Sequence, residues 1–407
     1  MGGRFFPLDE ALELLPGQLT PRLQEQVVRL GSWLPFQPAA QLFEAFTGVA
    51  ISAATVRRLT ETAGRMQVEQ QEAAVVAMEA GQMVMPESVP QKMVYAVDGA
   101  MVPLVGGEWA EVRTLAIGEA GVQERAEGDS EAMTQHLSYF SRLLDADSFA
   151  RAALVETERR GLHQAQQAAA VGDGAEWVQS FSDYHRPDAV RILDFPHAAE
   201  RFTTIVQACQ ERGVELGQDW AAQQRECLKD EGGTAVLATL RQLQETSPHI
   251  SLDEPLAYLS KREAMLQYPQ FQAEGWPIAS GMVESANKLV VEARLKGAGM
   301  HWHRDQVNPM LALRNVVCND RWDESWSTLT AALRQRRQKH ATTRRDEESP
   351  ADPLRVQRFF KEMQALYRDW EAQQRAAEKA NPKKPWKPPP DHPWRRDWPK
   401  PRRSAKK

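Results

Sequence analysis

The sequence predicts a mixed α/β protein in which a sheet domain is preceded, interrupted and followed by helical segments. Two changes of pattern lead to this prediction. The apolar residues change from helical spacing to strand-like runs near Lys92, and helical composition returns after about Pro196. A sheet that carries helices before, within and after it accounts for this order.

The N-terminal region is expected to be helical and to resemble a helix-turn-helix. Thr20 stands before one helical pattern and Ser52 before another, and both are favoured N-cap residues. Arg57 and Arg58 lie near the start of the helix after Ser52, where a helix-turn-helix makes its DNA contacts. A helical hairpin with a purely structural role fits the same pattern, so both interpretations stay open.

Five short β-rich runs are expected to form the sheet. The first three, MVYAV, EWAEVRTLAI and HLSYFSRLL, are separated by Gly-containing turns, which is typical of an antiparallel meander. After a helical segment come QAAAVGD and AVRILD, and each of them ends in an aspartate. Three meandering strands, a helix and two further strands describe a mixed sheet with helices packed on it.

The domain boundaries follow from these changes of pattern. We expect the helix-turn-helix-like region at 1–90, the core at 91–197 and 273–330, a helical insertion at 198–272, C-terminal helices at 331–380 and a disordered tail at 381–407. The tail is rich in Pro and Trp and carries a net charge of +8, which leaves −13 for the rest of the chain. Attraction to phosphates is one expected role of this charge, and a solubilising end is the other.

Composition excludes several classes of protein. The three cysteines are far apart and form no CxxC pair, which argues against a disulfide framework and a structural zinc site. No apolar run approaches the roughly 18 to 20 residues of a membrane span, and the first residues do not form a signal peptide. We therefore expect a cytoplasmic protein without a membrane partner.

Four carboxylates are candidates for chemistry. Asp98, Asp173 and Asp194 each end a short apolar run, and strand ends of such sheets converge on one site. Asp98 and Asp173 are both followed by glycine, which lets a phosphate approach the backbone closely. Glu284 lies near the start of a later helix, where the helix dipole favours an anion. Each residue alone could equally be a turn or helix-end residue.

Carboxylates from distant sequence positions are a donor set that suits Mg²⁺ or Mn²⁺. In phosphodiester cleavage, two ions about 3.5 to 4 Å apart stabilise both the attacking and the leaving oxygen. We therefore expect two divalent ions. Strand position alone does not rank Asp173 above Asp194 as the second acid, because both residues end strands.

The order of these elements resembles the ribonuclease H-like core of DDE transposases, with an α-helical insertion before the last acid. The motifs are similar to those of ISKra-type bacterial insertion-sequence transposases, a group related to the Mutator-like transposases. They are VDGAMVPL, WAEVR, VGDGAEWV, ILDFPHAAERF, GMVESANKLV and MHWHRDQVNPMLALR, and the resemblance spans roughly residues 5 to 330.

The resemblance implies the roles of the acids and the reaction. Asp98, Asp173 and Glu284 correspond to the catalytic, metal-binding acids, and Asp194 with His197 matches an accessory D-x-x-H motif. A histidine that only hydrogen-bonds Asp194 is the alternative for His197. The implied function is metal-dependent cleavage of transposon ends and transfer of the 3′-hydroxyl into target DNA. The implied partners are terminal inverted repeats, target DNA and a second copy of the chain, since two DNA ends must be brought together.

Basic residues after Glu284 are candidates for phosphate contact. Lys288, Arg294 and Lys296 follow it on the same helical segment. Some DDE enzymes have a basic residue seven positions after the third acid, but Val291 occupies that position here. We therefore prefer Lys288.

One departure from the family leaves a second function open. Family members often begin with a Cys-rich, zinc-ribbon-like segment, whereas this sequence begins with MGGRFFPLDEAL. The alternative is a truncated or domesticated transposase that binds DNA without transposing. The intact carboxylates favour the enzyme.

Overall fold

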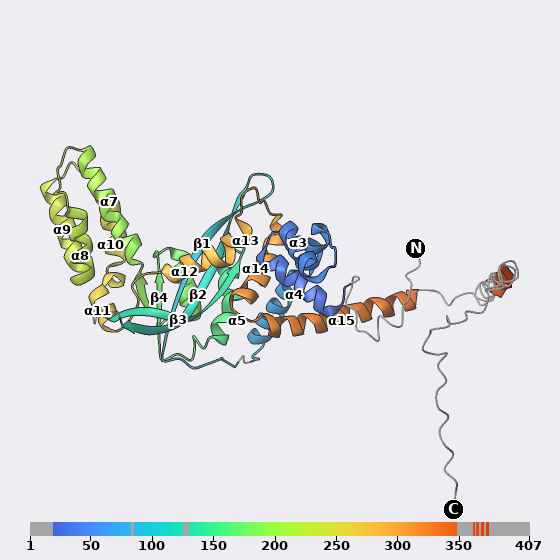
Figure 1. The fold of residues 1–407 in the computed structure, drawn as a ribbon. Coiled ribbons are helices and arrows are strands. Elements are labelled where there is room, and N and C mark those ends of the chain that lie inside the picture. Colours follow the sequence, from blue (N-terminus) through green and yellow to red (C-terminus); the bar gives the residue numbers. More distant parts are fainter. Residues whose placement is uncertain are drawn as a thin grey trace, which may run out of the picture. The chain divides into compact units, whose positions relative to one another are not determined.

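The computed structural model describes residues 19–82, 85–124 and 130–347, with short pieces between 361 and 373 (Figure 1). Contacts divide the chain into two units, Met1–Arg337 and Gln338–Lys407. The sheet, the N-terminal helices and the helical insertion all belong to the first unit. The expected disordered tail, 381–407, lies outside the described residues.

Five strands form a mixed sheet in the order β3-β2-β1-β4-β5 (Figure 1). The first three strands form an antiparallel meander, and β4 and β5 run parallel to β1. Their bounds are β1 (Lys92–Pro103), β2 (Trp109–Glu124), β3 (Ser130–Arg142), β4 (Gln167–Gly172) and β5 (Val190–Leu193). The predicted mixed α/β fold, with an antiparallel meander followed by two further strands, is confirmed.

The β2–β3 hairpin is longer than its apolar runs predict. Residues 119–124 of β2 pair with residues 130–135 of β3, although this part of the sequence is largely polar. The register shifts between Ile117 and Glu119, and His136 has a positive φ of 51° opposite that point. The backbone hydrogen bonds of the ladder extend past a bulge, and a hydrophobicity pattern does not signal this.

Helices cover both faces of the sheet. On one face, Phe149 of α5 and Phe181 of α6 pack with Tyr95 of β1 in a shared apolar core. On the other face, α12 to α14 pack against β1 and β2. The bounds of these helices are α5 (Ala146–Arg159), α6 (Glu176–His185), α12 (Gly281–Ala286), α13 (Ala293–Leu295) and α14 (Arg304–Cys318).

The N-terminal helices begin where the sequence predicts. The side-chain oxygen of Thr20 accepts a hydrogen bond from the Leu23 amide at 3.3 Å, and that of Ser52 accepts one from the Thr55 amide at 3.2 Å. The bounds are α2 (Pro21–Trp33), α3 (Phe36–Thr47) and α4 (Ala53–Glu79). These helices share an apolar core with α14 and with α15 (Trp322–Glu347), so they pack on the sheet domain.

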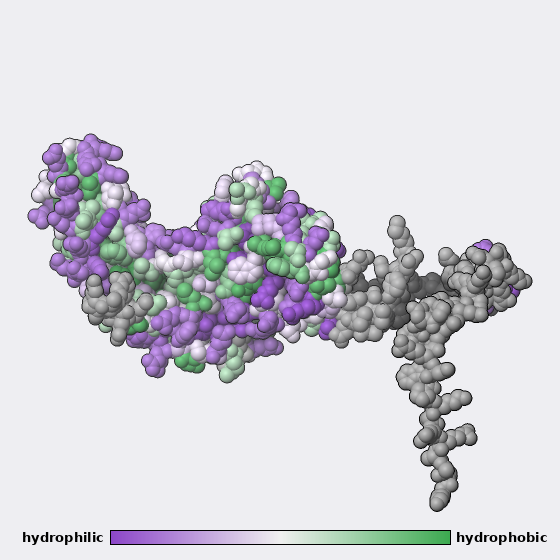
Figure 2. All heavy atoms as spheres, viewed as in Figure 1, coloured by the Kyte–Doolittle hydropathy of each residue, from purple (hydrophilic) through white to green (hydrophobic). Residues whose placement is uncertain are grey.

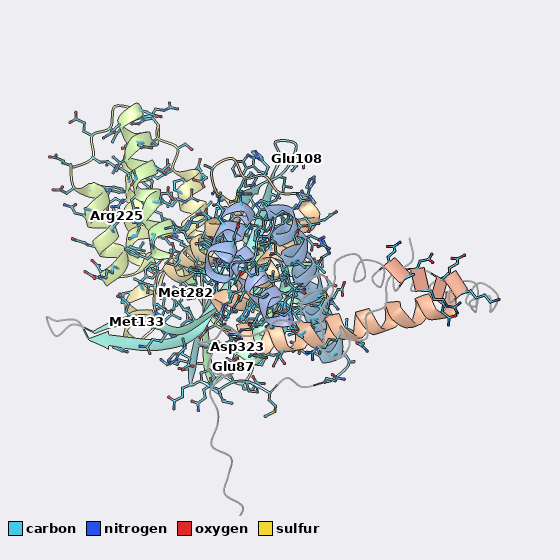
Figure 3. The ribbon with its side chains drawn as sticks, turned by 45° about the vertical axis from the view of Figure 1, so that its right-hand side comes forward. Glu87, Glu108, Met133, Arg225, Met282 and Asp323 are labelled. Carbon is cyan, nitrogen blue, oxygen red and sulfur yellow. The ribbon has the colours of Figure 1, made fainter. Side chains whose placement is uncertain are left out.

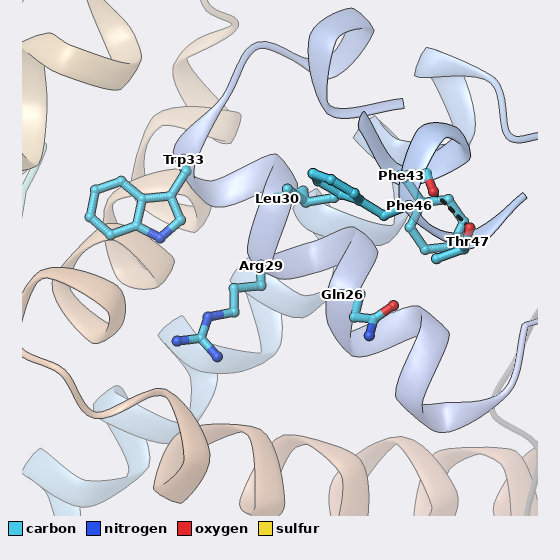
Figure 4. A pocket seen from close by; sticks show the side chains of 7 residues that line it. All are labelled: Gln26, Arg29, Leu30, Trp33, Phe43, Phe46 and Thr47. Atoms are coloured by element: carbon cyan, nitrogen blue, oxygen red, sulfur yellow. Dashed lines mark hydrogen bonds between the residues drawn. The ribbon is translucent and has the colours of Figure 1, made fainter. Parts of the chain in front are cut away.

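The surface of the N-terminal helices is partly apolar. Figure 2 shows apolar residues over α3 and α4, and the Phe46 side chain is 78% exposed. A pocket of about 420 Å³ lies between α2 and α3 (Figure 4). Its lining consists of Gln26, Arg29, Leu30, Trp33, Phe43, Phe46 and Thr47. The pocket therefore includes none of the candidate acids.

The insertion is helical, as predicted. Its elements are α7 (Phe195–Glu211), α8 (Trp220–Asp230), α9 (Gly233–Thr246), α10 (Asp253–Lys261), a short 3₁₀ helix (Glu263–Leu266) and α11 (Tyr268–Ala273). Gly213 and Gly232, which both have a positive φ, separate the first three helices. The apolar core of the insertion is continuous with that of β4 and β5, as Val171 and Ile192 show. Within the described ranges, no helix is long and apolar enough to cross a membrane.

The helix that carries Glu284 is not a regular α-helix throughout. It begins at Gly281, and Glu284 lies near this start, as predicted. Residues Asn287–Glu292 then form a π-helix before α13 completes the run. The buried Arg314 of α14 donates hydrogen bonds to the Leu289 and Val290 carbonyls within this wider turn. A tertiary contact therefore supports a geometry that local sequence does not predict.

Candidate active site

Asp98 is placed by the alternation of β1. Ala96, two residues earlier, packs against Val283 and Ala286 of α12. Because side chains two apart on a strand lie on the same face, Asp98 also lies on the face covered by α12. Its side chain is partly buried there.

Asp173 follows directly after β4, in a turn that the insertion supports. One of its carboxylate oxygens accepts a hydrogen bond from the Ala175 amide at 2.9 Å. The Tyr258 hydroxyl donates to the Asp173 carbonyl at 2.8 Å, and Arg262 donates to the Gly174 carbonyl at 2.8 Å. Gly174 has a positive φ of 76°, which a residue with a side chain rarely adopts. The insertion therefore fixes the turn that carries the second candidate acid.

Glu284 lies in the first turn of α12 with an exposed side chain. Burial raises the pKa of Asp98 above its usual value, and the negative charges of Asp173 and Glu284 raise it further. These charges are therefore close enough to act on one another. That the three carboxylates form one metal site stays a prediction.

Asp194 has a different environment from the other acids. Its carboxylate is fully buried, and one oxygen accepts a hydrogen bond from the Ser280 amide at 2.6 Å. The other oxygen accepts from the His197 amide at 3.1 Å and from His197 Nδ1 at 2.6 Å. Both oxygens of Asp194 are therefore occupied by protein donors.

His197 is held between Asp194 and the other acids. Nδ1 donates to Asp194, so the second ring nitrogen, Nε2, is not used in this hydrogen bond and can contact a ligand. The side chain is 47% exposed. Burial lowers the pKa of His197, but the hydrogen bond that its ring donates to Asp194 and the charges of Asp194, Asp173 and Asp98 outweigh burial and raise the pKa. The ring is thus favoured as a cation beside the acids.

The chemistry of the site suits a hard divalent cation. The donors are carboxylate oxygens, and burial together with the charges of Asp173 and Glu284 raises the pKa of Asp98. The candidate ligands are not close together. Among the described residues, no group of three or more His, Cys, Asp or Glu side chains is gathered closely enough to hold an ion. Catalytic groups often tighten only when substrate is bound, so the donor set fits a cation although the present spacing does not enclose one.

Asn287 is a site residue that the sequence analysis missed. Its amide Nδ2 donates a hydrogen bond to Asp98 Oδ2 at 2.9 Å, from the same helical run as Glu284. Its distance in sequence from Glu284 could have identified it, because residues three apart on a helix share a face. An Asn three residues after Glu284 therefore points toward the same place.

Lys288 and Lys296 both lie exposed on the segment that follows Glu284. Lys296 forms an ion pair with Glu292 at 2.8 Å, which partly neutralises its charge. On α4, Arg58 is exposed, and Arg57 is exposed with a longer ion pair to Glu61 at 3.6 Å. These four residues remain available for phosphate contact.

Arg294 lies elsewhere than the sequence analysis expects, and it is not a surface residue. It is 1% exposed, and its guanidinium donates to the Gly31 carbonyl at 3.1 Å. The guanidinium also lies over the rings of Phe36 and Trp302. Burial, and to a lesser extent Arg314, lowers its pKa to about 10. Arg294 therefore joins α2 to the sheet domain and does not reach a DNA phosphate.

A cavity of about 780 Å³ lies between β3, the start of α7 and the start of α12. Met133 of β3 and Met282 of α12 line it, and both are labelled in Figure 3. Its lining also includes Pro196, next to His197, and Ser285, next to Glu284. None of the residues that line this cavity is a candidate acid.

Comparison with known proteins yields little at the level of sequence. No family model matches the chain, and no curated protein matches it. Among solved structures, the strand transfer complex of the Drosophila P element transposase is similar over 80% of this chain and 86% of that chain, with 10% identity and a TM-score of 0.25. The fold assignment therefore depends on the strand order and helix placement described above.

Proposed function

We propose that the protein is a DDE-type DNA transposase of the ISKra type, in which Asp98, Asp173 and Glu284 bind two Mg²⁺ or Mn²⁺ ions. The observation that carries the proposal is the position of Asp98, where burial raises its pKa and the charges of Asp173 and Glu284 raise it further. Concentrated negative charge of this kind is costly unless a cation neutralises it. The reaction is cleavage at transposon ends followed by transfer of the 3′-hydroxyl into target DNA.

Asp173 is the better candidate than Asp194 for the second acid. The charge of Asp173 acts on Asp98, and one oxygen of its carboxylate is used in the local turn. Asp194 already accepts three hydrogen bonds through its two oxygens. Binding an ion through Asp194 would break contacts that hold His197 and Ser280 in place.

The protein groups have separable tasks. Divalent ions, when bound, stabilise the attacking and the leaving oxygen of the phosphodiester. Asp98, Asp173 and Glu284 supply the negative oxygens that hold them. Asp194 keeps the proton of His197 on Nδ1, and the positive ring attracts a phosphodiester.

DNA is the proposed partner, as terminal inverted repeats and as target. Lys288, Lys296, Arg57 and Arg58 are exposed cations that can contact phosphates, and the buried Arg294 is not among them. The active form is proposed to contain at least two copies of the chain, because two DNA ends must meet. Its proposed location is the cytoplasm.

Cleavage of a duplex that carries the terminal inverted repeats tests the proposed enzyme. In Mg²⁺ or Mn²⁺, Asp98→Asn is expected to reduce the cleavage rate by on the order of 10²-fold to 10³-fold or more, because it removes a charged ligand. DNA affinity should be retained. As a matched control, Asp188→Asn changes an exposed acid that pairs with Arg186, and it should leave the rate unchanged.

The same assay separates the enzyme from a DNA-binding protein without chemistry. If the wild-type chain bound the repeats but cleaved no faster than Asp98→Asn, the proposed enzyme would be wrong and the truncated or domesticated transposase would be supported.

A second pair of variants tests the choice between Asp173 and Asp194. Asp173→Asn should abolish cleavage with little loss of stability, since it removes charge from an already crowded site. Asp194→Asn should lower the free energy of unfolding by about 1 to 3 kcal/mol, because a buried acceptor that holds three donors is replaced. Urea denaturation and the cleavage rate measure the two effects, and the reverse pattern would assign the second acid to Asp194.

A further inference from the structure

Asn287 contacts Asp98 from the helix that carries Glu284. Its side chain is only 6% exposed, and its amide Nδ2 lies 2.9 Å from Asp98 Oδ2. The orientation of the amide is fixed by chemistry, because the reversed orientation would place two acceptor oxygens against each other. Asn287 therefore holds one of the two carboxylate oxygens of Asp98.

The amide oxygen of Asn287 is buried and has no hydrogen-bond partner. Leaving such a group unsatisfied costs about 1 to 3 kcal/mol, and folded proteins rarely do so without a reason. The orphaned oxygen lies on the residue that contacts Asp98, where negative charge from three acids converges. Its chemistry suits a donor or a cation that the protein itself does not supply.

The backbone at Asn287 is also unusual. Asn287 is the first residue of the π-helix that ends at Glu292. Single π-helical turns are rare and occur most often at functional sites. Here the wider turn is supported from α14 by Arg314, which is fully buried and donates to the Leu289 and Val290 carbonyls. The fold therefore maintains a specific position for Asn287.

We infer that Asn287 is a positioning residue of the metal site. Its amide NH₂ holds one carboxylate oxygen of Asp98 and leaves the other oxygen for a divalent cation. Its amide oxygen offers an uncharged hard acceptor to that cation or to a water molecule bound to it. This inference rests on the proposed function, because it requires that Asp98 bind a metal ion.

Calorimetric titration of the full chain with Mn²⁺ alone, without DNA, tests the inference. Asn287→Leu has a similar volume but lacks both polar atoms, and we expect it to weaken Mn²⁺ affinity by about 10-fold to 100-fold. Asn287→Asp keeps the shape of the side chain and supplies oxygen atoms that can bind a cation. It should therefore bind Mn²⁺ more tightly than Asn287→Leu does, by about 10-fold or more. This second variant keeps the test valid if the apolar substitution impairs folding.

Asn308 provides the matched control. It is another partly buried asparagine, on α14, but its amide oxygen accepts from the Leu143 amide at 2.7 Å and its Nδ2 donates to the Leu143 carbonyl at 3.1 Å. Asn308→Leu should lower the thermal unfolding midpoint and leave Mn²⁺ affinity unchanged. A purely structural role for Asn287 would give the same result for both asparagines, and that result would overturn the inference.

The outcomes distinguish this inference from the proposed function. If Asp98→Asn loses Mn²⁺ binding while Asn287→Leu binds like the wild-type chain, only the role of Asn287 is overturned. If the wild-type chain binds no Mn²⁺, the metal site and the role of Asn287 are both overturned. Weak binding by Asn287→Leu together with normal binding by Asn308→Leu supports both.

Discussion

The N-terminal helices and the insertion helices both pack on the sheet domain, but they are attached in different ways. The N-terminal helices are held through two buried arginines, Arg294 and Arg314, which donate to the Gly31 and Ser32 carbonyls at the end of α2. The insertion is attached at the acids, where Tyr258 donates to the Asp173 carbonyl. The first attachment is expected to govern stability, and the second is expected to govern the geometry of the site.

The largest expected effect comes from breaking the N-terminal attachment. Arg314→Met keeps much of the side-chain volume but removes the donors to the Ser32, Leu289 and Val290 carbonyls. Because buried carbonyls lose charged partners, the free energy of unfolding should fall by about 3 to 5 kcal/mol. Urea denaturation measures this change.

The exposed Arg58 of α4 provides the control for that variant. Arg58→Met should change the free energy of unfolding by no more than about 0.5 kcal/mol. Equal stability of the Arg314 and Arg58 variants would show that the buried arginine does not attach the N-terminal helices.

A smaller effect is expected from weakening the attachment of the insertion. Tyr258→Phe removes one hydrogen bond to the Asp173 carbonyl and should cost about 0.5 to 1.5 kcal/mol of stability. Because the lost bond holds the turn of a proposed metal ligand, the cleavage rate should fall by roughly 10-fold or more. The cleavage assay and urea denaturation measure the two losses, and their ratio is to be compared between this variant and a control variant.

Tyr268 is the natural comparator, since its hydroxyl donates to the Leu193 carbonyl at the same distance, 2.8 Å. Tyr268→Phe should cost similar stability and reduce the rate less, because Leu193 precedes Asp194 and not a proposed metal ligand. A rate loss of the same size in both variants would argue against a special role for the Asp173 turn.

The smallest effect concerns His197, at the start of the insertion. Its pKa is raised in the folded protein, so its contribution to stability is fully present below the ordinary histidine value of about 6.5 and is lost as pH rises through the higher folded value. The stability difference between the wild-type chain and His197→Gln should therefore be largest near pH 5.5 and smallest above pH 8. Since the side chain is 47% exposed, the difference should stay under about 1 kcal/mol.

Urea denaturation at three pH values across this window measures the difference. A difference that does not depend on pH would mean that the charge on His197 is not stabilised by the acids around it.

Local signals explain how much of the structure the sequence predicts. The side chains of Thr20 and Ser52 each accept a hydrogen bond from an amide three residues away, so these helix starts can be predicted without tertiary information. The five apolar runs predict the five strands, because the pattern of apolar residues within each run is also local. The ends of β2 and β3 could not be predicted, because polar residues there are held by cross-strand pairing.

Tertiary contacts explain what the sequence analysis missed at the site. A charged side chain on a helix normally points to solvent, and the burial of Arg294 depends on the rings of Phe36 and Trp302, which are distant in sequence from each other. Asn287 was missed because an uncharged residue in a helix carries little signal, and its role depends on Asp98. The three acids were chosen from strand ends and a helix start, which need no long-range detail, and their shared role stays a prediction.

The position of Asp194 has a consequence for how the insertion can vary. The chain leaves the core at Asp194 and returns at Ser280, and the Asp194 carboxylate joins these two points through the Ser280 amide. The Phe195 amide also donates to the Ile278 carbonyl at 2.9 Å, so the two ends of the insertion lie side by side. Because the entropy of closing a loop grows only with the logarithm of its length, segments of very different size can be accommodated between these ends. The helical insertion can thus lengthen or shorten over evolutionary time while the acids on either side of it keep their places.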